Sequence, residues 1–386
     1  MPRIRELGIY ESSLPPGPRN AITDVAGVLV GHATLLAGEG VADPDWRPGH
    51  GPLRTGVTLI VPHGGDLYAE KVVAAVHTIN GFGKVAGFEQ VRELGGLETP
   101  IALTGTMNVP RVADALMTLA IEQNPHIGAG FPESGYRGYA SVNPVVGETS
   151  DGYLSDLQAR PVGLTEVRAA LASAAAEVEE GAVGAGTGTS CYGWKGGIGT
   201  ASRQLPEESG GYTVGALVQS NFGAPEELVI SGVPVGNHLR PPGSGTKLEI
   251  RDPSPDSRRP DAGSIMIVLA TDASLAARGL ARLCHRAAFG LARTGSTGHG
   301  GSGDFVIAFS TTNRIPDQPE TPLMPRPVLY EQPFMDMFSL AVIESVEEAI
   351  YNSLLMAQTV VGRNGHVRYG LPGEDVARII RAYRPL

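Results

Sequence analysis

The sequence of 386 residues has few cysteines, few basic residues and no long hydrophobic run. Its two cysteines, Cys191 and Cys284, are too few for a disulfide framework and lack the spacing of metal ligands. No apolar run approaches the roughly 20 residues of a membrane helix, and residues 1–20 contain no stretch of signal-peptide length. We therefore expect a cytoplasmic protein with no membrane association and no metal.

Positive charge is also scarce, because 30 Lys and Arg face 40 Asp and Glu and give a net charge of −10. This balance opposes a phosphate backbone, and no Lys/Arg-rich run interrupts it, so nucleic acid is excluded as a partner. With 42% hydrophobic and 18% charged residues, the chain has the composition of a globular protein with a large core.

Glycine and proline are abundant, at 52 and 30 residues, and indicate many short elements joined by tight turns. Periodicity predicts strands over Gly56 to Val61, Pro100 to Thr104, Tyr212 to Ser220, Glu227 to Ile230, Ser264 to Thr271 and Asp304 to Ser310. It predicts helices over Ala69 to Ile79, Val109 to Glu122, Thr165 to Glu180, Ala273 to Leu291, Met335 to Gln358 and Asp375 to Tyr383. Strands and helices do not alternate one for one. The pattern therefore favours an α/β protein with packed sheets flanked by helices over a doubly wound parallel sheet.

Several familiar catalytic motifs fail. Gly184 to Ser190, GAGTGTS, looks like a phosphate loop, but it is expected to follow a helix and lacks the Gly-Lys-Ser/Thr ending. Neither a Gly-x-Ser-x-Gly elbow nor a His-Glu-x-x-His motif occurs, which argues against an α/β-hydrolase or a zinc protease. His299 precedes Ser302 by three residues and could act as its base, although a loop histidine among glycines is more often ordinary.

One junction stands out. Leu239 to Gly263 is dense in Pro, Asp, Arg, Ser and Gly, and it breaks into an apolar strand that opens with Ser264. This arrangement suits an N→O acyl shift, because Gly263 has no side chain to hinder attack on its carbonyl. Cleavage would give Ser264 a free α-amine with a pKa of about 7.7–8.0, suited to a general base. By composition alone, Gly-Ser in an exposed loop is an ordinary turn.

Five stretches resemble the P1 peptidases, peptidase family S58, in order over nearly the whole chain: GPRNAITDVAGVLVGHATL (Gly17 to Leu35), GAGTGTSCYGWKGGIGTASR (Gly184 to Arg203), VQSNFG (Val218 to Gly223), AGSIMIVLATDA (Ala262 to Ala273) and GSGDFVIAFST (Gly301 to Thr311). The family contains L-aminopeptidase/D-alanine esterase-amidases and β-peptidyl aminopeptidases. The resemblance implies a single four-layered αββα domain of the N-terminal-nucleophile hydrolase type. It also implies self-cleavage into residues 1–263 and 264–386, a tetramer of cleaved heterodimers, and no cofactor.

The resemblance also implies roles for particular residues. Ser264 would be the nucleophile, Ser302 and Asp304 would orient it and its amine, Asn221 would stabilise the oxyanion, and Glu148 would bind the substrate ammonium. Ser150 stands where some members have an oxyanion-binding tyrosine. β-Peptidyl members tend to have Glu where this chain has Asp304, which argues against strong β-peptide activity.

We therefore expect a serine aminopeptidase that releases small N-terminal residues from peptides, amides or esters through an acyl-enzyme. Two alternatives stay open. One is acyl transfer as in ornithine acetyltransferases, whose threonine nucleophile differs from Ser264. The other is an uncleaved, inactive scaffold of the same fold.

Overall fold

A computed structural model describes residues 1–40, 46–129, 140–243, 263–319, 321, 323 and 325–384. Most of the loop expected over Leu239 to Gly263 lies outside these residues. The strands are β1 (Leu29–Ala37), β2 (Leu53–Val61), β3 (Glu70–Gly81), β4 (Gly96–Leu97), β5 (Ile101–Gly105), β6 (Val145–Thr149), β7 (Ser190–Cys191), β8 (Trp194–Lys195), β9 (Ile198–Gln204), β10 (Thr213–Asn221), β11 (Ser264–Thr271), β12 (Gly303–Pro316), β13 (Val360–Val361) and β14 (Val367–Arg368). The helices are α1 (Phe88–Leu94), α2 (Val109–Gln123), α3 (Leu164–Ala172), α4 (Ala277–Arg293), α5 (Met335–Leu355) and α6 (Gly373–Tyr383).

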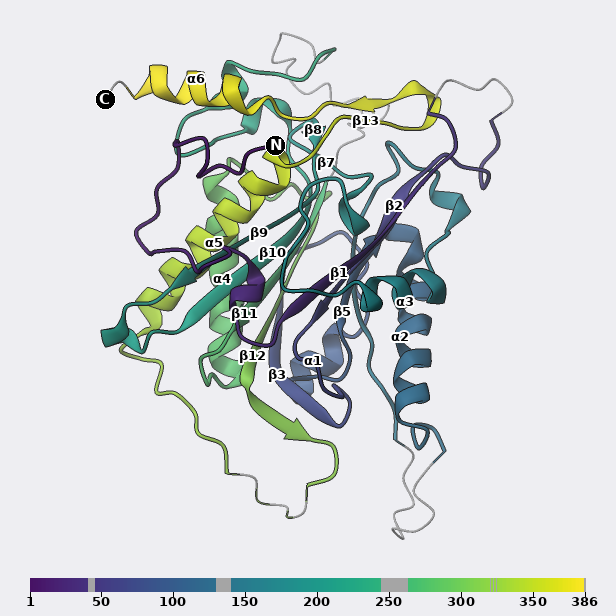
Figure 1. The fold of residues 1–386 in the computed structure, drawn as a ribbon, viewed down its shortest axis with the longest axis vertical. Coiled ribbons are helices and arrows are strands. Elements are labelled where there is room, and N and C mark those ends of the chain that lie inside the picture. Colours follow the sequence, from purple (N-terminus) through teal and green to yellow (C-terminus); the bar gives the residue numbers. More distant parts are fainter. Residues whose placement is uncertain are drawn as a thin grey trace.

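Two sheets form the centre of the molecule. One has four strands in the order β1-β2-β5-β6, and the other has six in the order β4-β3-β12-β11-β10-β9. Helices α4 and α5 contact the six-stranded sheet, while α2 and α3 contact the four-stranded sheet on the opposite side of the molecule (Figure 1). The layers therefore run helix, sheet, sheet, helix, and the predicted αββα sandwich is confirmed.

The strands of the six-stranded sheet are buried on both faces. Along β11, Met266 and Val268 join a core shared with residues of the other sheet, such as Ile60 and Leu103. Ile267, between them, joins a second core with residues of α4 and α5. Because successive side chains of a strand point to opposite faces, β11 is apolar on both faces from Ile265 to Ala270, between its polar ends Ser264 and Thr271. This is why its predicted bounds, Ser264 to Thr271, agree with the structure.

Some predicted elements are wrong. Ala69 to Ile79 forms strand β3 and not a helix, and it pairs with β12 and β4. Residues 72–76 of β3 are buried on both faces, so this run of Val and Ala lacks the alternation that identifies a strand. The predicted strand over Glu227 to Ile230 is a 3-10 turn (Pro225–Glu227) followed by an isolated bridge at Ile230. The helix predicted over Thr165 to Glu180 ends at Ala172.

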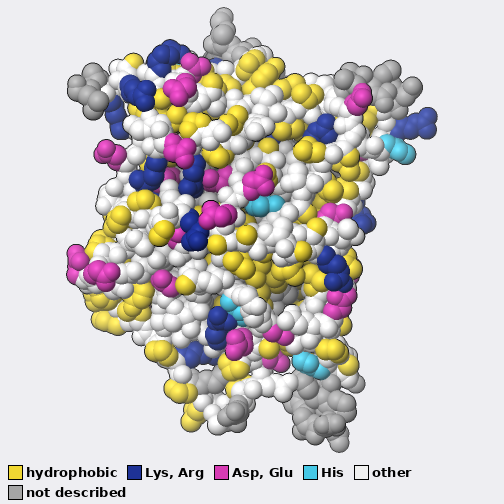
Figure 2. Space-filling model, viewed as in Figure 1, with side chains coloured by type: hydrophobic (Ala, Val, Ile, Leu, Met, Phe, Trp, Pro, Cys, Tyr) yellow, Lys and Arg dark blue, Asp and Glu magenta, His cyan; other side chains and the backbone are white. Residues whose placement is uncertain are grey.

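The surface carries both signs of charge. Figure 2 shows acidic and basic side chains interspersed over the face in view, with hydrophobic side chains between them. Among the described residues, no helix combines the length and the apolar character needed to span a bilayer. Cys191 and Cys284 are both buried as free thiols.

Candidate active site

Three neighbouring inner strands of the six-stranded sheet bring the predicted residues together where the strands end. Ser264 is the first residue of β11, and it lies opposite Asn221, the last residue of β10. On its other side Ser264 is in register with Gly303, the first residue of β12. Ser264 and Asn221 are only 6% and 9% exposed, so both polar side chains lie in a largely dry environment.

The Gly263–Ser264 junction leaves no room for a larger residue before the serine. A Cβ built on Gly263 would lie 2.3 Å from both the Asn221 carbonyl oxygen and Phe222 Cα. The Gly303 amide donates to the Gly263 carbonyl oxygen at 3.1 Å and also lies 3.4 Å from Ser264 Oγ. One backbone N–H is therefore shared between the predicted scissile carbonyl and the predicted nucleophile.

Ser302 and Asp304 form a buried pair beside this junction. The Ser302 hydroxyl donates to Asp304 Oδ1 at 2.5 Å. Burial raises the pKa of Asp304, which is 1% exposed, to about 6, against the opposing effects of the Ser302 hydroxyl, the Ile265 amide and His299. Asp304 is therefore mostly ionised at neutral pH, but it can take up a proton close to that range.

Alternation along the strands separates this pair from the serine hydroxyl. Ser264 shares the face of Met266, toward the other sheet, whereas Asp304 shares the helix-facing side with Val306. The hydrogen-bond partner of Ser264 Oγ is the Gly303 amide, and that of the Ser302 hydroxyl is Asp304. Of the two contacts expected for Ser302, one to the α-amine therefore fits better than one to the hydroxyl.

His299 is bound elsewhere through its ring. Its Nε2 lies 2.9 and 3.0 Å from the two carboxylate oxygens of Glu227. Only its backbone serves Ser302, because the His299 carbonyl accepts from the Ser302 amide at 2.8 Å. The ring is thus committed to a carboxylate, which removes the reason to consider it a base for Ser302.

The Asn221 amide has a fixed orientation. Its Oδ1 accepts the Ser190 backbone N–H at 2.8 Å, which leaves Nδ2 as the end that can donate to another group. Ser190 is the last residue of the GAGTGTS segment. This segment begins with a 3-10 turn (Gly184–Gly186) and is preceded by an extended residue, Val183, so it does not follow a helix as expected. The segment that fails as a phosphate loop is therefore part of the candidate active site.

Glu148 reaches the same place from the other sheet. It is 3% exposed near the end of β6, and its Oε1 accepts the Lys84 amide N–H at 2.9 Å. Burial raises the pKa of Glu148, opposed by the amide and charge of Lys84 and by the Thr106 hydroxyl. A Cβ built on Gly83 would lie 3.3 Å from Glu148 Oε1 and 3.2 Å from Gly303 Cα. Gly83 thus spans the narrow distance between this carboxylate and the start of β12.

Ser150 takes part in a local turn. Its Oγ accepts the Gly152 amide N–H at 3.4 Å. Within the described part of the chain, its hydroxyl is not hydrogen-bonded to Ser264 or Asn221.

Residues 20–368 match the sequence model of peptidase family S58. The chain belongs to this family. Its sequence is 40% identical over 390 residues to the β-peptidyl aminopeptidase BapA of Sphingosinicella xenopeptidilytica, an alignment that covers 100% of this chain and 92% of BapA.

Solved structures agree with this assignment. The PH0078 protein of Pyrococcus horikoshii OT3 is similar with a TM-score of 0.88 and 45% identity over 100% of both chains. The L-aminopeptidase D-Ala-esterase/amidase of Ochrobactrum anthropi gives a TM-score of 0.84 and 36% identity over 99% of both chains. That enzyme is described as a prototype of the serine aminopeptidases and a new variant of the Ntn hydrolase fold. The S58 chain is accordingly a hydrolase of the aminopeptidase class with this fold, as its sequence predicts.

Sequence reasoning missed several residues that hold the S58 site together. Asn80 Nδ2 donates to the carbonyl oxygens of Ser302 and His299. Gly83 and Lys84 seat Glu148, and Ser190 orients Asn221. The glycine-punctuated sequence NGFGK at residues 80–84 was a usable signal of a close backbone approach, but the helix expected just before it concealed the strand end.

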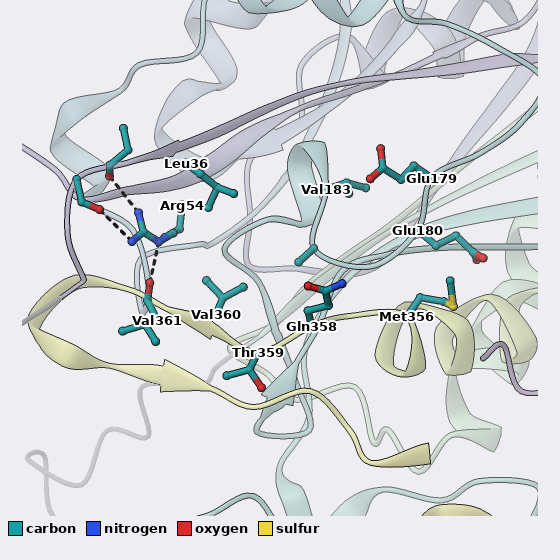
Figure 3. A pocket seen from close by; sticks show the side chains of 13 residues that line it. Leu36, Arg54, Glu179, Glu180, Val183, Met356, Gln358, Thr359, Val360 and Val361 are labelled. Atoms are coloured by element: carbon teal, nitrogen blue, oxygen red, sulfur yellow. Dashed lines mark hydrogen bonds between the residues drawn. The ribbon is translucent and has the colours of Figure 1, made fainter. Parts of the chain in front are cut away.

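A separate pocket of the S58 chain lies between the end of β1, residues 179–183 and the segment that follows α5 (Figure 3). None of the candidate site residues lines it. The guanidinium of Arg54 at its wall donates to the backbone carbonyls of Ala37, Gly38, Leu53 and Val361. Arg54 is thus occupied in joining backbone segments. Nowhere in the described residues do three or more His, Cys, Asp or Glu side chains gather in a way that could hold a metal ion.

Proposed function

We propose that this S58 aminopeptidase activates itself by cutting the Gly263–Ser264 bond and then acts through Ser264 as an N-terminal nucleophile. The observation that carries the proposal is the shared Gly303 amide, which contacts both the Gly263 carbonyl oxygen and Ser264 Oγ. A donor on the carbonyl oxygen polarises the carbon toward attack, and the adjacent hydroxyl is the nearest nucleophile.

Self-cleavage proceeds through an N→O acyl shift. Ser264 Oγ attacks the Gly263 carbonyl carbon and loses its proton, and the negative charge of the tetrahedral intermediate is stabilised by the Gly303 amide. The C–N bond then breaks, and its nitrogen takes up a proton to become the α-amine of Ser264. Water hydrolyses the resulting ester, which releases the Gly263 carboxylate and restores the Ser264 hydroxyl. Gly263 suits this chemistry, because its neighbours Asn221 and Phe222 exclude any side chain.

Turnover repeats this chemistry on an external substrate. The α-amine accepts the Ser264 hydroxyl proton as Oγ attacks the substrate carbonyl, and it returns the proton to the leaving amine or alcohol. Water then hydrolyses the acyl-enzyme on Ser264. Asn221 Nδ2 and the Gly303 amide are the donors for the oxyanion, since both lie on residues paired with Ser264. The Ser302–Asp304 pair holds the α-amine and balances its positive charge.

Glu148 selects substrates with a free N-terminal amine. A nearly buried carboxylate that accepts one amide hydrogen bond keeps acceptor capacity for an ammonium group. The substrates are therefore peptides, amides or esters with a free N-terminal amine, from which a small N-terminal residue is released. Asp304 is shorter than the glutamate of β-peptidyl members, which argues against strong β-peptide activity.

The two products of cleavage, residues 1–263 and 264–386, remain one αββα domain. In the six-stranded sheet, β11 and β12 belong to the smaller product, and their outer neighbours β10 and β3 belong to the larger one. Two strand pairs, β10–β11 and β12–β3, therefore join the two products. This sheet and its buried faces hold the pair together, and the pairs assemble as tetramers.

The test compares the parent with Ser264→Ala and with Ser345→Ala, a buried serine of α5 whose hydroxyl has no hydrogen-bond partner among the described residues. Hydrolysis of amino-acid p-nitroanilides should disappear in Ser264→Ala and persist in Ser345→Ala. Activity of Ser264→Ala at the parental rate would locate the nucleophile elsewhere. An intact, inactive parent would support the scaffold alternative, and a parent that transfers acyl groups to added amines faster than to water would support acyl transfer.

A further inference from the structure

A lysine is buried completely behind the active-site loop. Lys195 is 0% exposed, although lysine is almost never fully buried without partners. Its Nζ donates to the carbonyl oxygens of Gly186 at 2.7 Å and Gly196 at 2.6 Å. These two glycines flank the loop that contains Ser190, so the ammonium ties the two ends of the loop together.

The loop is a short hairpin that leads directly to Asn221. Ser190 of β7 pairs with Lys195 of β8. The hairpin is anchored from the side of β10 by the Tyr192 amide, which donates to the Phe222 carbonyl at 2.7 Å. The Ser190 amide then donates to Asn221 Oδ1 at 2.8 Å. The lysine is thus linked to the Asn221 amide through its bonds to the loop ends, the Gly196 amide that donates to the Thr189 carbonyl at 3.1 Å, and the Ser190 amide next in the chain.

The surroundings of Lys195 make its charge costly. Burial lowers the pKa of Lys195 to about 7, opposed by Cys191 and Asp151, while Arg368 lowers it further. Asp151 is itself buried, and this burial raises the pKa of its carboxyl to about 6. Apolar residues of similar volume often serve a fold as well as buried charges do. Space filling alone therefore does not account for an ammonium at this position.

We propose that Lys195 is a positioning residue of the reaction, which acts through the Ser190 amide to hold Asn221 with its Nδ2 toward the oxyanion. This inference rests on the proposed function, in which Asn221 stabilises that oxyanion. Without the ammonium, the two ends of the loop can separate and the Ser190 amide can shift. The Asn221 side chain then loses the contact that fixes which end of its amide donates.

The test is a double-mutant cycle of Lys195→Met and Asn221→Ala. The kcat of each variant is divided by the fraction of its chains that have been cleaved before Ser264, and intact mass measures this fraction. Removal of one oxyanion donor lowers kcat by about 10²- to 10³-fold, so Asn221→Ala should fall in that range and Lys195→Met should lose roughly 10- to 100-fold. KM should stay close to the parental value in both variants. In the Asn221→Ala background, Lys195→Met should cause no further loss.

Two further variants separate positioning from folding. Lys195→Gln retains N–H donors without the charge, so its kcat should be higher than that of Lys195→Met. If Lys195→Met does not fold, Lys195→Gln takes its place in the double-mutant cycle. Lys71→Met removes an ion-paired lysine at Asp317, outside the site, and should leave kcat unchanged.

The outcomes differ for the two levels of the proposal. Losses that multiply in the double variant would overturn the inference, because Lys195 would then act independently of Asn221. A normal kcat for Lys195→Met beside an impaired Asn221→Ala would overturn the inference alone. A normal kcat for Asn221→Ala would overturn both the inference and the oxyanion role of Asn221.

Discussion

Replacement of Glu148 by glutamine tests how the enzyme recognises a free N-terminus. Glu148→Gln keeps the shape of a side chain that is 3% exposed and whose Oε1 accepts the Lys84 amide at 2.9 Å. It removes the charge that the proposal pairs with the substrate ammonium. A hydrogen bond to a charged group contributes about 1.5–3 kcal/mol, so kcat/KM for alanine p-nitroanilide should fall roughly 10- to 150-fold.

The pH dependence of kcat/KM gives the prediction a second observable. Burial raises the pKa of Glu148 above the ordinary value of 4.5. The carboxylate is charged above its pKa, so the parental kcat/KM for free-amine substrates should decline with falling pH before an ordinary glutamate would cause a decline. Glu148→Gln should lack this decline, because glutamine does not titrate. The measurement is the pH profile of both proteins from acidic to neutral pH.

A matched control exists at the opposite end of β5 and β6. Glu98 also has a pKa raised by burial, and its Oε2 accepts the Asn143 amide at 2.8 Å. Glu98→Gln should leave kcat/KM at the parental value. N-acetylated substrates should be poor for the parent and no poorer for Glu148→Gln. If Glu148→Gln loses activity equally on free and acetylated substrates, its role is structural and the reasoning fails.

Asp304, Gly263 and the effect of a chelator can each be tested separately. Asp304→Asn should impair turnover of the cleaved enzyme. In the uncut Ser264→Ala chain, which has no α-amine beside Asp304, it should stabilise the fold at neutral pH by up to about 3 kcal/mol, because a raised carboxyl pKa, here about 6, means that ionisation opposes folding. This gain should shrink as pH falls through 6 toward the ordinary value of 3.8, and thermal melting across this range measures it. Gly263→Ala should block self-cleavage and lower the melting temperature because its Cβ meets the backbone of Asn221, whereas Gly64→Ala, with nothing within 4 Å, should do neither. EDTA should leave activity unchanged; a loss that zinc restores would contradict a metal-free mechanism.

The sequence predicts elements best where one pattern dominates. Strand β11 is correct to the residue because a polar loop gives way abruptly to a continuous apolar run. Strand β3 is missed because both of its faces are buried and its Val and Ala residues imitate a helix. β6 (Val145–Thr149) is also missed, since its five residues include Gly147 and Glu148 and are too short to show a period.

The candidate site shows the same division. Ser264, Ser302, Asp304, Asn221 and Glu148 were named from a family resemblance, and the structure brings all five to one end of the sheets. Their supports depend on backbone groups, such as the Ser190 amide on Asn221 and the Gly303 amide on Gly263. Backbone amides occur at nearly every position, so a sequence carries no mark of which ones become functional. The register of the strands decides which backbone amides lie beside the nucleophile, and this register is visible only in the structure.

The intact mass of the purified protein tests the central claim, self-cleavage at Gly263–Ser264, most directly. The parent should give two masses, for residues 1–263 and 264–386, and the smaller chain should begin with serine on N-terminal sequencing. Ser264→Ala, purified in parallel, should give the mass of one uncut chain. A parent that remains a single chain of 386 residues after prolonged incubation, yet hydrolyses amino-acid p-nitroanilides, would contradict the account.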